Sequence, residues 1–382
     1  MEIGILTWLH NGNYGTVLQA YALQRYLRDK GYEVHNLDYA PSALEKVLNL
    51  LKSKNSPSLF LEKWENYLTR KKASHQKLES KYKKFDVFLE NNFHLTDRII
   101  SPKQIKSYSD RFEVFICGSD QIWSPMLFNP VYYFDFVDDS KIKISYACSF
   151  GVSEIPDNKR NVIKGLLQRY TNISVREQEG CRIVYKLLEQ QVPVVVDPVF
   201  LLEQSEWDKI AAEKLLEEDY IFAYFLSNND EHVKIAMDIA GQYNLKLVLV
   251  PVTKEQYDID AILVEDAGPE EWISLIKHAK IVLTDSFHGS VFSLIYEKKL
   301  MIFKRFSDNS KKSQNSRIYT LIKQYGLEDW LVSGRDRESY LQNLEDKYDT
   351  KRYKAIKECI RCNSDDSKKW LLECICKNSY TN

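Results

Sequence analysis

The stretch from Lys280 to Ile295, KIVLTDSFHGSVFSLI, joins an apolar strand to a helix through a polar turn. We expect the strand over 281–283, the turn through 284–289, and then a helix with apolar positions Val291, Phe292, Leu294 and Ile295. A strand that leads into the start of a helix presents backbone N–H groups and a positive dipole to an anion. His288 lies in this turn, so the sequence predicts an anion site that includes a histidine.

The order of strand, polar turn and helix recurs along the chain. Further strands are predicted over 3–7, 32–38, 113–116, 131–137, 143–148, 172–175, 193–196, 220–225 and 246–250. Helical patterns, such as those over 231–243 and 269–278, alternate with them. This alternation predicts doubly wound parallel sheets whose loops gather at one edge.

The alternation restarts once, between Leu202 and Asp219, where an acidic helix over 206–218 precedes a fresh strand. With 382 residues the chain is long enough for two domains. We expect an α/β protein with two Rossmann-like domains facing a cleft, over 1–205 and 206–335. A helical basic insertion at about 42–95 and a helical, cysteine-containing tail over 336–382 complete the predicted organisation.

The composition excludes some classes of function. The chain is 44% hydrophobic and 28% charged, and its formal net charge of −1 argues against a strongly basic nucleic-acid binder. The residues after Met1 lack the basic segment and the long apolar segment of a secretory signal. No later apolar run approaches the roughly 20 residues that a membrane helix needs. We therefore expect a cytoplasmic protein without a nucleic-acid partner, whose seven cysteines are thiols.

Polar residues follow several predicted strands. The first strand leads into Asn11, Asn13 and Tyr14, and Thr16 is expected to cap the next helix. This loop lacks the G-x-G-x-x-G pattern, which weakens a dinucleotide-binding interpretation. Later strand ends carry Ser119, Asp120, Gln121 and Trp123, then Arg176 and Glu177, then Asp197.

Six collinear segments resemble the polysaccharide pyruvyl transferase family: NGNYGTVLQAYAL, GSDQIW, SYACSFG, SVRE, DPVFLL and TDSFHGSVFSLIY. The resemblance covers roughly residues 3 to 325. It implies a glycosyltransferase-B-like pair of Rossmann domains that moves pyruvate from phosphoenolpyruvate onto a sugar as a ketal. Such enzymes act in capsule, exopolysaccharide or cell-wall polymer synthesis, and the resemblance implies no cofactor beyond phosphoenolpyruvate as donor substrate.

The first loop departs from this family. Many members carry Gly-Asp where this chain has Asn13, Tyr14 and Gly15. This difference argues against an acid or base in the first loop.

The donor carries a carboxylate and a phosphate, so its site needs cations and N–H donors. We expect Arg176, Ser286, His288 and Gly289 to bind it, with His288 binding an anion or giving a proton to the leaving phosphate. The alternative for Arg176 is a surface ion pair with Glu177 or Glu179. Arg305, Asn315 and Arg317 either complete the anion site or lie on the surface, and surface placement is the safer expectation.

Ketal formation needs a general base for the sugar hydroxyls. Asp120 and Asp285 are the candidates, and Asp120 is preferred, with capping of the following turn as its alternative role. The acceptor-binding candidates are Asn11, Asn13, Tyr14, Ser119, Gln121 and Trp123, although Trp123 is as easily a core residue. We expect the acceptor to be a saccharide. A saccharide linked to a lipid would lie at a membrane.

The insertion and the tail each leave two interpretations. Residues 52–84 contain ten Lys or Arg and three Glu, which suits a solvated surface helix or a contact with an anionic membrane at its inner face. In the tail, Cys359, Cys362, Cys374 and Cys376 permit a metal site, but the C-x-C spacing of the second pair is tighter than usual. We expect no metal.

Two other functions remain open from the sequence. One is a glycosyltransferase with a nucleotide-sugar donor in the same two-domain fold. The other is a non-catalytic protein that binds sugars or anions.

Overall fold

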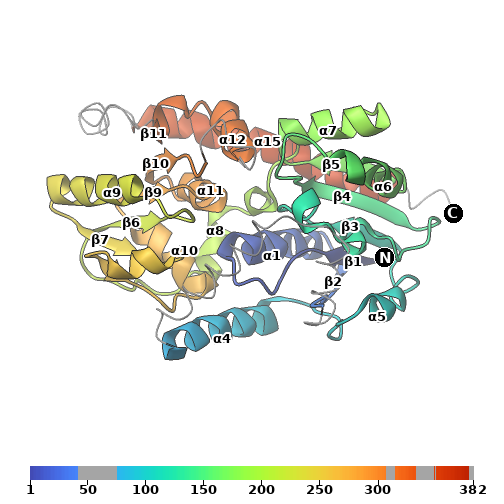
Figure 1. Cartoon of the computed structure of the whole chain (residues 1–382), viewed down its shortest axis with the longest axis horizontal. Coiled ribbons are helices and arrows are strands. Elements are labelled where there is room, and N and C mark those ends of the chain that lie inside the picture. The colour runs from blue at the N-terminus through green and yellow to red at the C-terminus, as the bar shows by residue number, and fades with distance from the viewer. Residues whose placement is uncertain (42–74, 307–314, 333–347, 349, 378–382) are drawn as a thin grey trace. The chain divides into compact units, whose positions relative to one another are not determined.

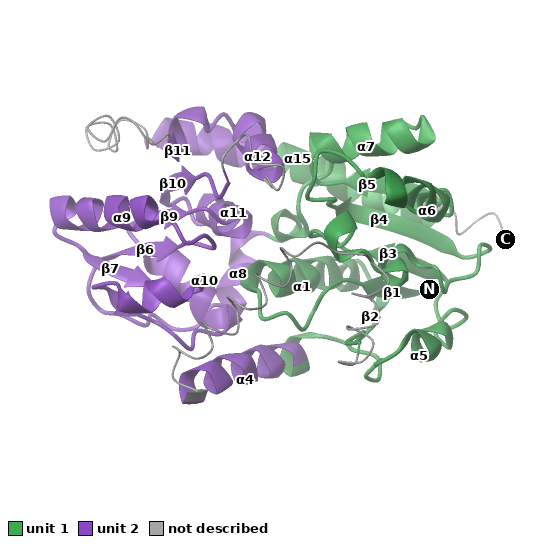
Figure 2. Cartoon of the chain, in the orientation of Figure 1, with its two compact units in different colours: residues 1–55, 90–202, 361–382 green, residues 56–89, 203–360 purple. Residues whose placement is uncertain are grey.

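The computed structural model describes residues 1–41, 75–306, 315–332, 348 and 350–377. The chain divides into two units, each assembled from separate parts of the sequence (Figure 2). Unit 1 comprises residues 1–55, 90–202 and 361–382, and unit 2 comprises 56–89 and 203–360. The cleft predicted between the two domains stays a prediction.

In the described part of unit 1, five parallel strands form one sheet in the order β2-β1-β3-β4-β5. The strands are β1 (Glu2–Leu6), β2 (Glu33–Asn36), β3 (Val114–Cys117), β4 (Ile142–Cys148) and β5 (Asn172–Val175). Nearly every residue of β3, β4 and β5 is buried, as expected for a sheet covered on both faces.

Helices cover both faces of this sheet (Figure 1). On one face, α6 (Asp157–Leu167) and α7 (Gln178–Leu188) pack against a core that includes Phe115 and Ile173. On the other lie α1 (Tyr14–Asp29) and the end of α15 (Thr350–Lys377), where Trp370 meets Tyr146. The short helix α5 (Pro102–Lys106) precedes β3.

In the described part of unit 2, six parallel strands form a sheet in the order β11-β10-β9-β6-β7-β8. The strands are β6 (Tyr220–Tyr224), β7 (Lys246–Leu249), β8 (Ile262–Leu263), β9 (Ile281–Thr284), β10 (Lys299–Phe303) and β11 (Leu331–Val332). The helices around this sheet include α8 (Gln204–Ile210), α9 (Asp230–Tyr243), α10 (Pro269–His278), α11 (Phe287–Ile295) and α12 (Ser316–Tyr325). The prediction of two parallel α/β domains is therefore confirmed.

Alternate residues of β6 point to opposite faces of this sheet, as the strand period requires. Ile221 and Ala223 join the core beneath α9, whereas Tyr224 packs edge-on against Trp272 of α10 at 5.4 Å between ring centroids. Figure 1 shows α9 and α10 on the two sides of β6 and β7. The central strands are thus buried from both sides, which explains their continuous apolar sequences.

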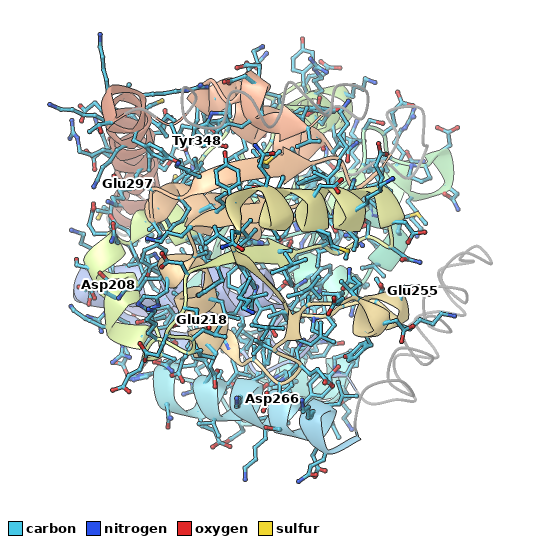
Figure 3. The ribbon with its side chains drawn as sticks, turned by 90° about the vertical axis from the view of Figure 1, so that its left-hand side faces the viewer. Asp208, Glu218, Glu255, Asp266, Glu297 and Tyr348 are labelled. Atoms are coloured by element: carbon cyan, nitrogen blue, oxygen red, sulfur yellow. The ribbon has the colours of Figure 1, made fainter. Side chains whose placement is uncertain are left out.

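The described end of the insertion is the helix α4 (His75–Asn92), and two of its four lysines pair with acidic residues of unit 2. Lys84 contacts Glu271 at 2.7 Å and Asp266 at 3.5 Å, and Lys77 contacts Glu265 at 3.1 Å. Figure 3 shows Asp266 beside this helix. Residues 52–74 of the predicted membrane contact lie outside the described residues, and Lys77 and Lys84 already have acidic partners.

Three predicted elements are wrong. Residues 131–137 form no strand: Pro130 starts a short 3-10 helix (Pro130–Tyr133), because the Asn129 side chain accepts a hydrogen bond from the backbone of Val131. Residues 193–196 make only an isolated bridge between Val194 and Val175. The acidic helix predicted over 206–218 stops at Ile210, after which the backbone N–H of Ala212 donates to α10.

Candidate functional site

The carboxyl ends of β1, β3, β4 and β5 bring polar residues together at one edge of the sheet in unit 1, because parallel strands end on the same side. Ser119 and Asp120 follow β3, Ser149 follows β4, and Arg176 and Glu177 follow β5. All five side chains are buried. The edge is therefore a polar cluster built into the fold.

Arg176 is the centre of this cluster. Its Nη1 donates to Asp197 at 2.7 Å, and its Nη2 lies 3.5 Å from an oxygen of Asp120. Burial lowers the pKa of Arg176, but the carboxylates of Asp197, Asp120 and Glu177 together raise that pKa above its ordinary value. The Arg176 side chain is only 2% exposed, so the alternative of a surface ion pair is wrong.

Asp120 has an unusual backbone conformation. Its φ is 72°, in the left-handed region that side chains other than glycine seldom occupy. One carboxylate oxygen accepts from the Thr16 hydroxyl at 2.5 Å, and the other accepts from the backbone of Gln121 at 2.9 Å. Ala147, in the irregular part of β4, has a φ of 53°. Such conformations persist where surrounding contacts hold them, often at functional sites.

Asp197 and Glu177 also belong to this cluster, although neither was predicted to be a site residue. Asp197 accepts from the Ser119 hydroxyl at 3.2 Å as well as from Arg176, and its other oxygen caps the backbone of Val199 at 3.1 Å. Glu177 accepts from Ser149 at 2.8 Å. Their signal in the sequence is weak: Asp197 directly follows the apolar run 194–196, and Glu177 follows Arg176 at the end of a strand.

The acceptor candidates separate into two groups. Ser119, Asn11 and Gln121 lie at the polar edge, and the Asn11 amide donates to the Thr16 hydroxyl at 3.4 Å. Trp123 is fully buried and stacks on Tyr133 at 5.5 Å between ring centroids, so it is a core residue and offers no ring face to a sugar.

The first loop differs from the prediction in its helix start. Asn13, and not Thr16, caps α1: its side chain accepts from the backbone of Thr16 at 3.2 Å. Tyr14 is the first residue of the helix and is 1% exposed, which removes it from direct contact with a ligand. Thr16 instead uses its hydroxyl to hold Asp120.

In unit 2, the stretch from β9 to α11 forms the expected strand and helix, but the helix begins earlier than predicted. Ser286 caps α11 by accepting from the backbone of Gly289 at 3.2 Å, so His288 lies in the first turn of the helix. His288 is 6% exposed. The positive end of the helix dipole is thus at the carboxyl end of the central strand β9.

Gly289 serves the packing of this helix on its strand. A Cβ added there would lie 2.6 Å from the hydroxyl of Thr284, which itself donates to the carbonyl of Tyr224 at 2.6 Å. Only glycine permits this approach without displacement. The backbone N–H of Gly289 is already used by the Ser286 cap.

Asp285 has a local structural role. Its carboxylate accepts from the backbone N–H groups of Leu226 at 2.6 Å and Ser227 at 3.0 Å, and from the Ser227 hydroxyl. These donors surround both oxygens and fix the loop after β6. Both oxygens of Asp120 also accept hydrogen bonds, so the preference for Asp120 over Asp285 as the base stays a prediction.

The residues beyond β10 are not all on the surface. Arg305 is half-buried and lies two residues after the end of β10, the strand that pairs with β9, and so at the same sheet edge. Asn315 is 3% exposed, and its amide binds both the carbonyl of Phe306 at 2.7 Å and the N–H of Phe306 at 3.3 Å. Arg317 is the second residue of α12 and is half-buried.

The tail cysteines lie on one continuous helix, α15. Between Cys362 and Cys374 the helix rises about 18 Å at about 1.5 Å per residue. Cys374 is buried and Cys362 is exposed. The structure does not bring the two pairs together.

A sequence comparison decides the family. The family model for polysaccharide pyruvyl transferases matches residues 13–305, which is most of the chain and includes Asp120, Arg176 and His288. The chain belongs to the polysaccharide pyruvyl transferase family. No curated protein matched the sequence in a separate search.

Solved structures show which fold this pyruvyl transferase family member adopts. It is similar to the UDP-N-acetylglucosamine 2-epimerase of Rickettsia bellii, with a TM-score of 0.56, 10% identity, and coverage of 100% of this chain and 97% of that one. Arabidopsis thaliana UGT89C1 complexed with UDP-L-rhamnose gives a TM-score of 0.54 at 10% identity, with 98% and 99% coverage. The 2-epimerase of Neisseria meningitidis bound to UDP-GlcNAc gives 0.52 at 10% identity, with 99% and 100% coverage. These likenesses show a glycosyltransferase-B-like fold and nothing about the substrate.

Proposed function

We propose that this protein transfers the pyruvyl group of phosphoenolpyruvate to a sugar as a ketal and releases phosphate. The observation that carries the proposal is His288, buried in the first turn of α11 at the carboxyl end of β9, within the matched region of the family. A helix start and a histidine side chain together suit an anion that must leave as phosphate.

In unit 2, the donor half of the reaction rests on charge. The amino end of α11 and the guanidinium of Arg305 supply positive potential at the same sheet edge. His288 either binds the phosphate as an imidazolium or gives a proton to it as the carbon–oxygen bond breaks. Ser286 fixes the helix start, and Gly289 lets α11 approach β9 closely.

In unit 1, the acceptor half rests on the polar cluster. Asp120 takes the proton of a sugar hydroxyl, because its carboxylate is the most exposed of those around Arg176, at 11% of its side chain. Arg176 is held between Asp197 and Asp120, so it orients Asp120 even where it does not bind the donor. Ser119, Asn11 and Gln121 supply hydrogen-bonding groups nearby.

The acceptor is a saccharide precursor of a capsule, exopolysaccharide or cell-wall polymer, carried on a lipid in the most direct version of the proposal. Such an acceptor would place the enzyme in the cytoplasm at the inner face of the membrane. The described residues contain no helix with the length and apolar character needed to span a membrane. Vesicle flotation with and without anionic lipid tests the proposed membrane contact of residues 52–84. Binding to neither kind of vesicle would contradict that contact.

An acceptor screen that follows phosphate release from phosphoenolpyruvate tests the reaction itself. We expect release with a matching sugar, and a loss of about 100-fold or more in kcat for His288→Ala. His278→Gln is the matched control, because His278 lies in α10 of the same unit and contacts Ser274. Release that is unaffected by His288→Ala would contradict the assignment of this residue.

Thermal shift separates the competing functions. Phosphoenolpyruvate should raise the melting temperature of the protein, because a ligand that binds only the folded state stabilises it. Stabilisation by UDP- or CMP-sugars alone would favour a nucleotide-sugar glycosyltransferase. Stabilisation by phosphoenolpyruvate without phosphate release for any acceptor would favour a non-catalytic binding protein.

A further inference from the structure

A second group of polar residues lies at the carboxyl edge of the sheet in unit 1, on the far side of β1 from Asp120. His10 lies beyond the end of β1, and Asp38 lies beyond the end of the neighbouring strand β2. Arg98 belongs to a segment that runs beside the end of β2, where Tyr39 bridges to Ile99. The sheet order thus brings together three side chains that are distant in the sequence.

The contacts within this group are direct. His10 Nε2 is hydrogen-bonded to Asp38 Oδ1. Arg98 Nη1 lies 3.3 Å from the other oxygen of Asp38, and 3.1 Å and 3.4 Å from the two ring nitrogens of His10. Burial raises the pKa of Asp38, but the hydrogen bond with His10 and the charge of Arg98 hold that pKa below its ordinary value. Asp38 is therefore a carboxylate that faces the imidazole.

This arrangement sets the tautomer of His10. A carboxylate accepts a hydrogen bond, so Nε2 carries the proton toward Asp38, and Nδ1 keeps its lone pair. The Asp38 side chain is 9% exposed and its backbone N–H is bound by Thr96 Oγ1 at 3.0 Å, which fixes its position. The His10 side chain is 18% exposed, so a ligand can reach it. The Arg98 side chain is 53% exposed, but its Nη1 is paired with Asp38 and lies 3.4 Å from His10 Nδ1. Arg98 therefore has to turn toward solvent before Nδ1 can accept a proton.

We propose that His10 is a second general base for the acceptor, oriented by Asp38, an inference that rests on the proposed pyruvyl transfer. Two sugar hydroxyls must lose protons to make one ketal, and Asp120 accounts for one of them. His10 is next to Asn11, whose amide reaches the Thr16 hydroxyl that holds Asp120. The first loop therefore connects the two bases. The expectation against an acid or base in this loop concerned Asn13, Tyr14 and Gly15, and His10 precedes them.

The reaction removes two hydroxyl protons in sequence, and two bases at this edge can take one each. One hydroxyl oxygen bonds to the central carbon of phosphoenolpyruvate as its methylene carbon gains a proton, and the second bonds to the same carbon as the carbon–oxygen bond to phosphate breaks. Two hydroxyl protons leave: one balances the proton that makes the methyl group, and the other balances the hydrogen phosphate that departs. His10 Nδ1 takes one of these protons as the imidazolium forms against Asp38, and returns it to solvent.

His10→Gln tests the proposal in the phosphate-release assay on the full chain. We expect kcat to fall about 100- to 10,000-fold with KM for the acceptor changed by less than about threefold, since a base acts on the chemical step. His35→Gln is the matched control, because His35 in β2 has the same 18% side-chain exposure and also faces a carboxylate, Glu33 at 3.5 Å. Its activity should equal that of the unchanged protein.

Two further measurements exclude a merely structural effect. Added imidazole should restore at least about tenfold of the activity lost in His10→Ala, because a small base can occupy the vacated space. Asp38→Asn should lower kcat as well, through the wrong tautomer of His10. Full activity of His10→Gln, or loss without rescue by imidazole, overturns the inference. Absence of phosphate release by the unchanged protein with every acceptor overturns the proposed function instead.

Discussion

Asp197→Asn removes one carboxylate charge from the buried cluster of unit 1 and leaves the side-chain shape unchanged. The lost contact is the 2.7 Å bond between Asp197 and Arg176 Nη1, where the exposed fractions of the two side chains are 0% and 2%. Removing one partner of a buried ion pair costs about 3–5 kcal/mol, because the other charge stays buried. Asp120, 3.5 Å from Arg176, still offsets part of that charge. We therefore expect the lower end, about 3 kcal/mol.

Urea unfolding followed by tryptophan fluorescence measures this loss. With a slope of about 2 kcal/mol per molar urea, the midpoint for unit 1 should fall by about 1.5 M. Glu154→Gln is the control, because Glu154 and its partner Lys186 are 76% and 65% exposed, and exposed pairs contribute little. We expect no measurable shift for it. Equal midpoints for Asp197→Asn and the unchanged protein would refute the buried pair.

Three further predictions concern other parts of the molecule. His288→Ala should lower the rate of phosphate release about 100-fold or more while leaving the urea midpoint of the protein within error. The pKa of Asp38 is lowered in the folded state, so this carboxylate stabilises the fold above its unfolded-state pKa of about 4. That stabilisation is lost as the pH falls through the lower pKa of the folded state. Asp38→Asn should therefore flatten this part of an acid unfolding curve. Gly289→Ala should destabilise by about 1–3 kcal/mol through the 2.6 Å approach to Thr284, whereas Gly165→Ala, with nothing within 4 Å in a helix, should stabilise slightly; equal thermal shifts would contradict this contrast.

The elements that local sequence determines were predictable. Helix α10 has the predicted bounds of 269–278 because Pro269 suits a helix start and the apolar positions repeat at helical spacing. Strand β5 likewise has the predicted bounds. The sequence also places three candidate site residues at sheet edges, because each follows the end of a predicted strand: Arg176, Asp120 and His288.

The pairing of side chains was not predictable, because it depends on strand order. Arg176 and Asp197 meet only because the chain after β5 returns beside Val175. His10 and Asp38 meet because β1 pairs with β2, and nothing local marks either residue. Trp123 shows the opposite case: it follows a polar run that indicates a site, yet its ring turns into the core.

The end of α15 has a consequence for how the protein is made. Ser364 donates to the carbonyl of Phe200 at 2.7 Å, and Ser367 accepts from the backbone of Val196 at 3.0 Å, so residues 361–377 complete the first unit. The ribosome synthesises these residues after all of unit 2. Unit 1 therefore cannot complete its fold until residues 361–377 have been synthesised. Until then, the surface that these residues cover stays exposed. A fragment that ends near residue 205 would keep that surface exposed and should associate or bind chaperones.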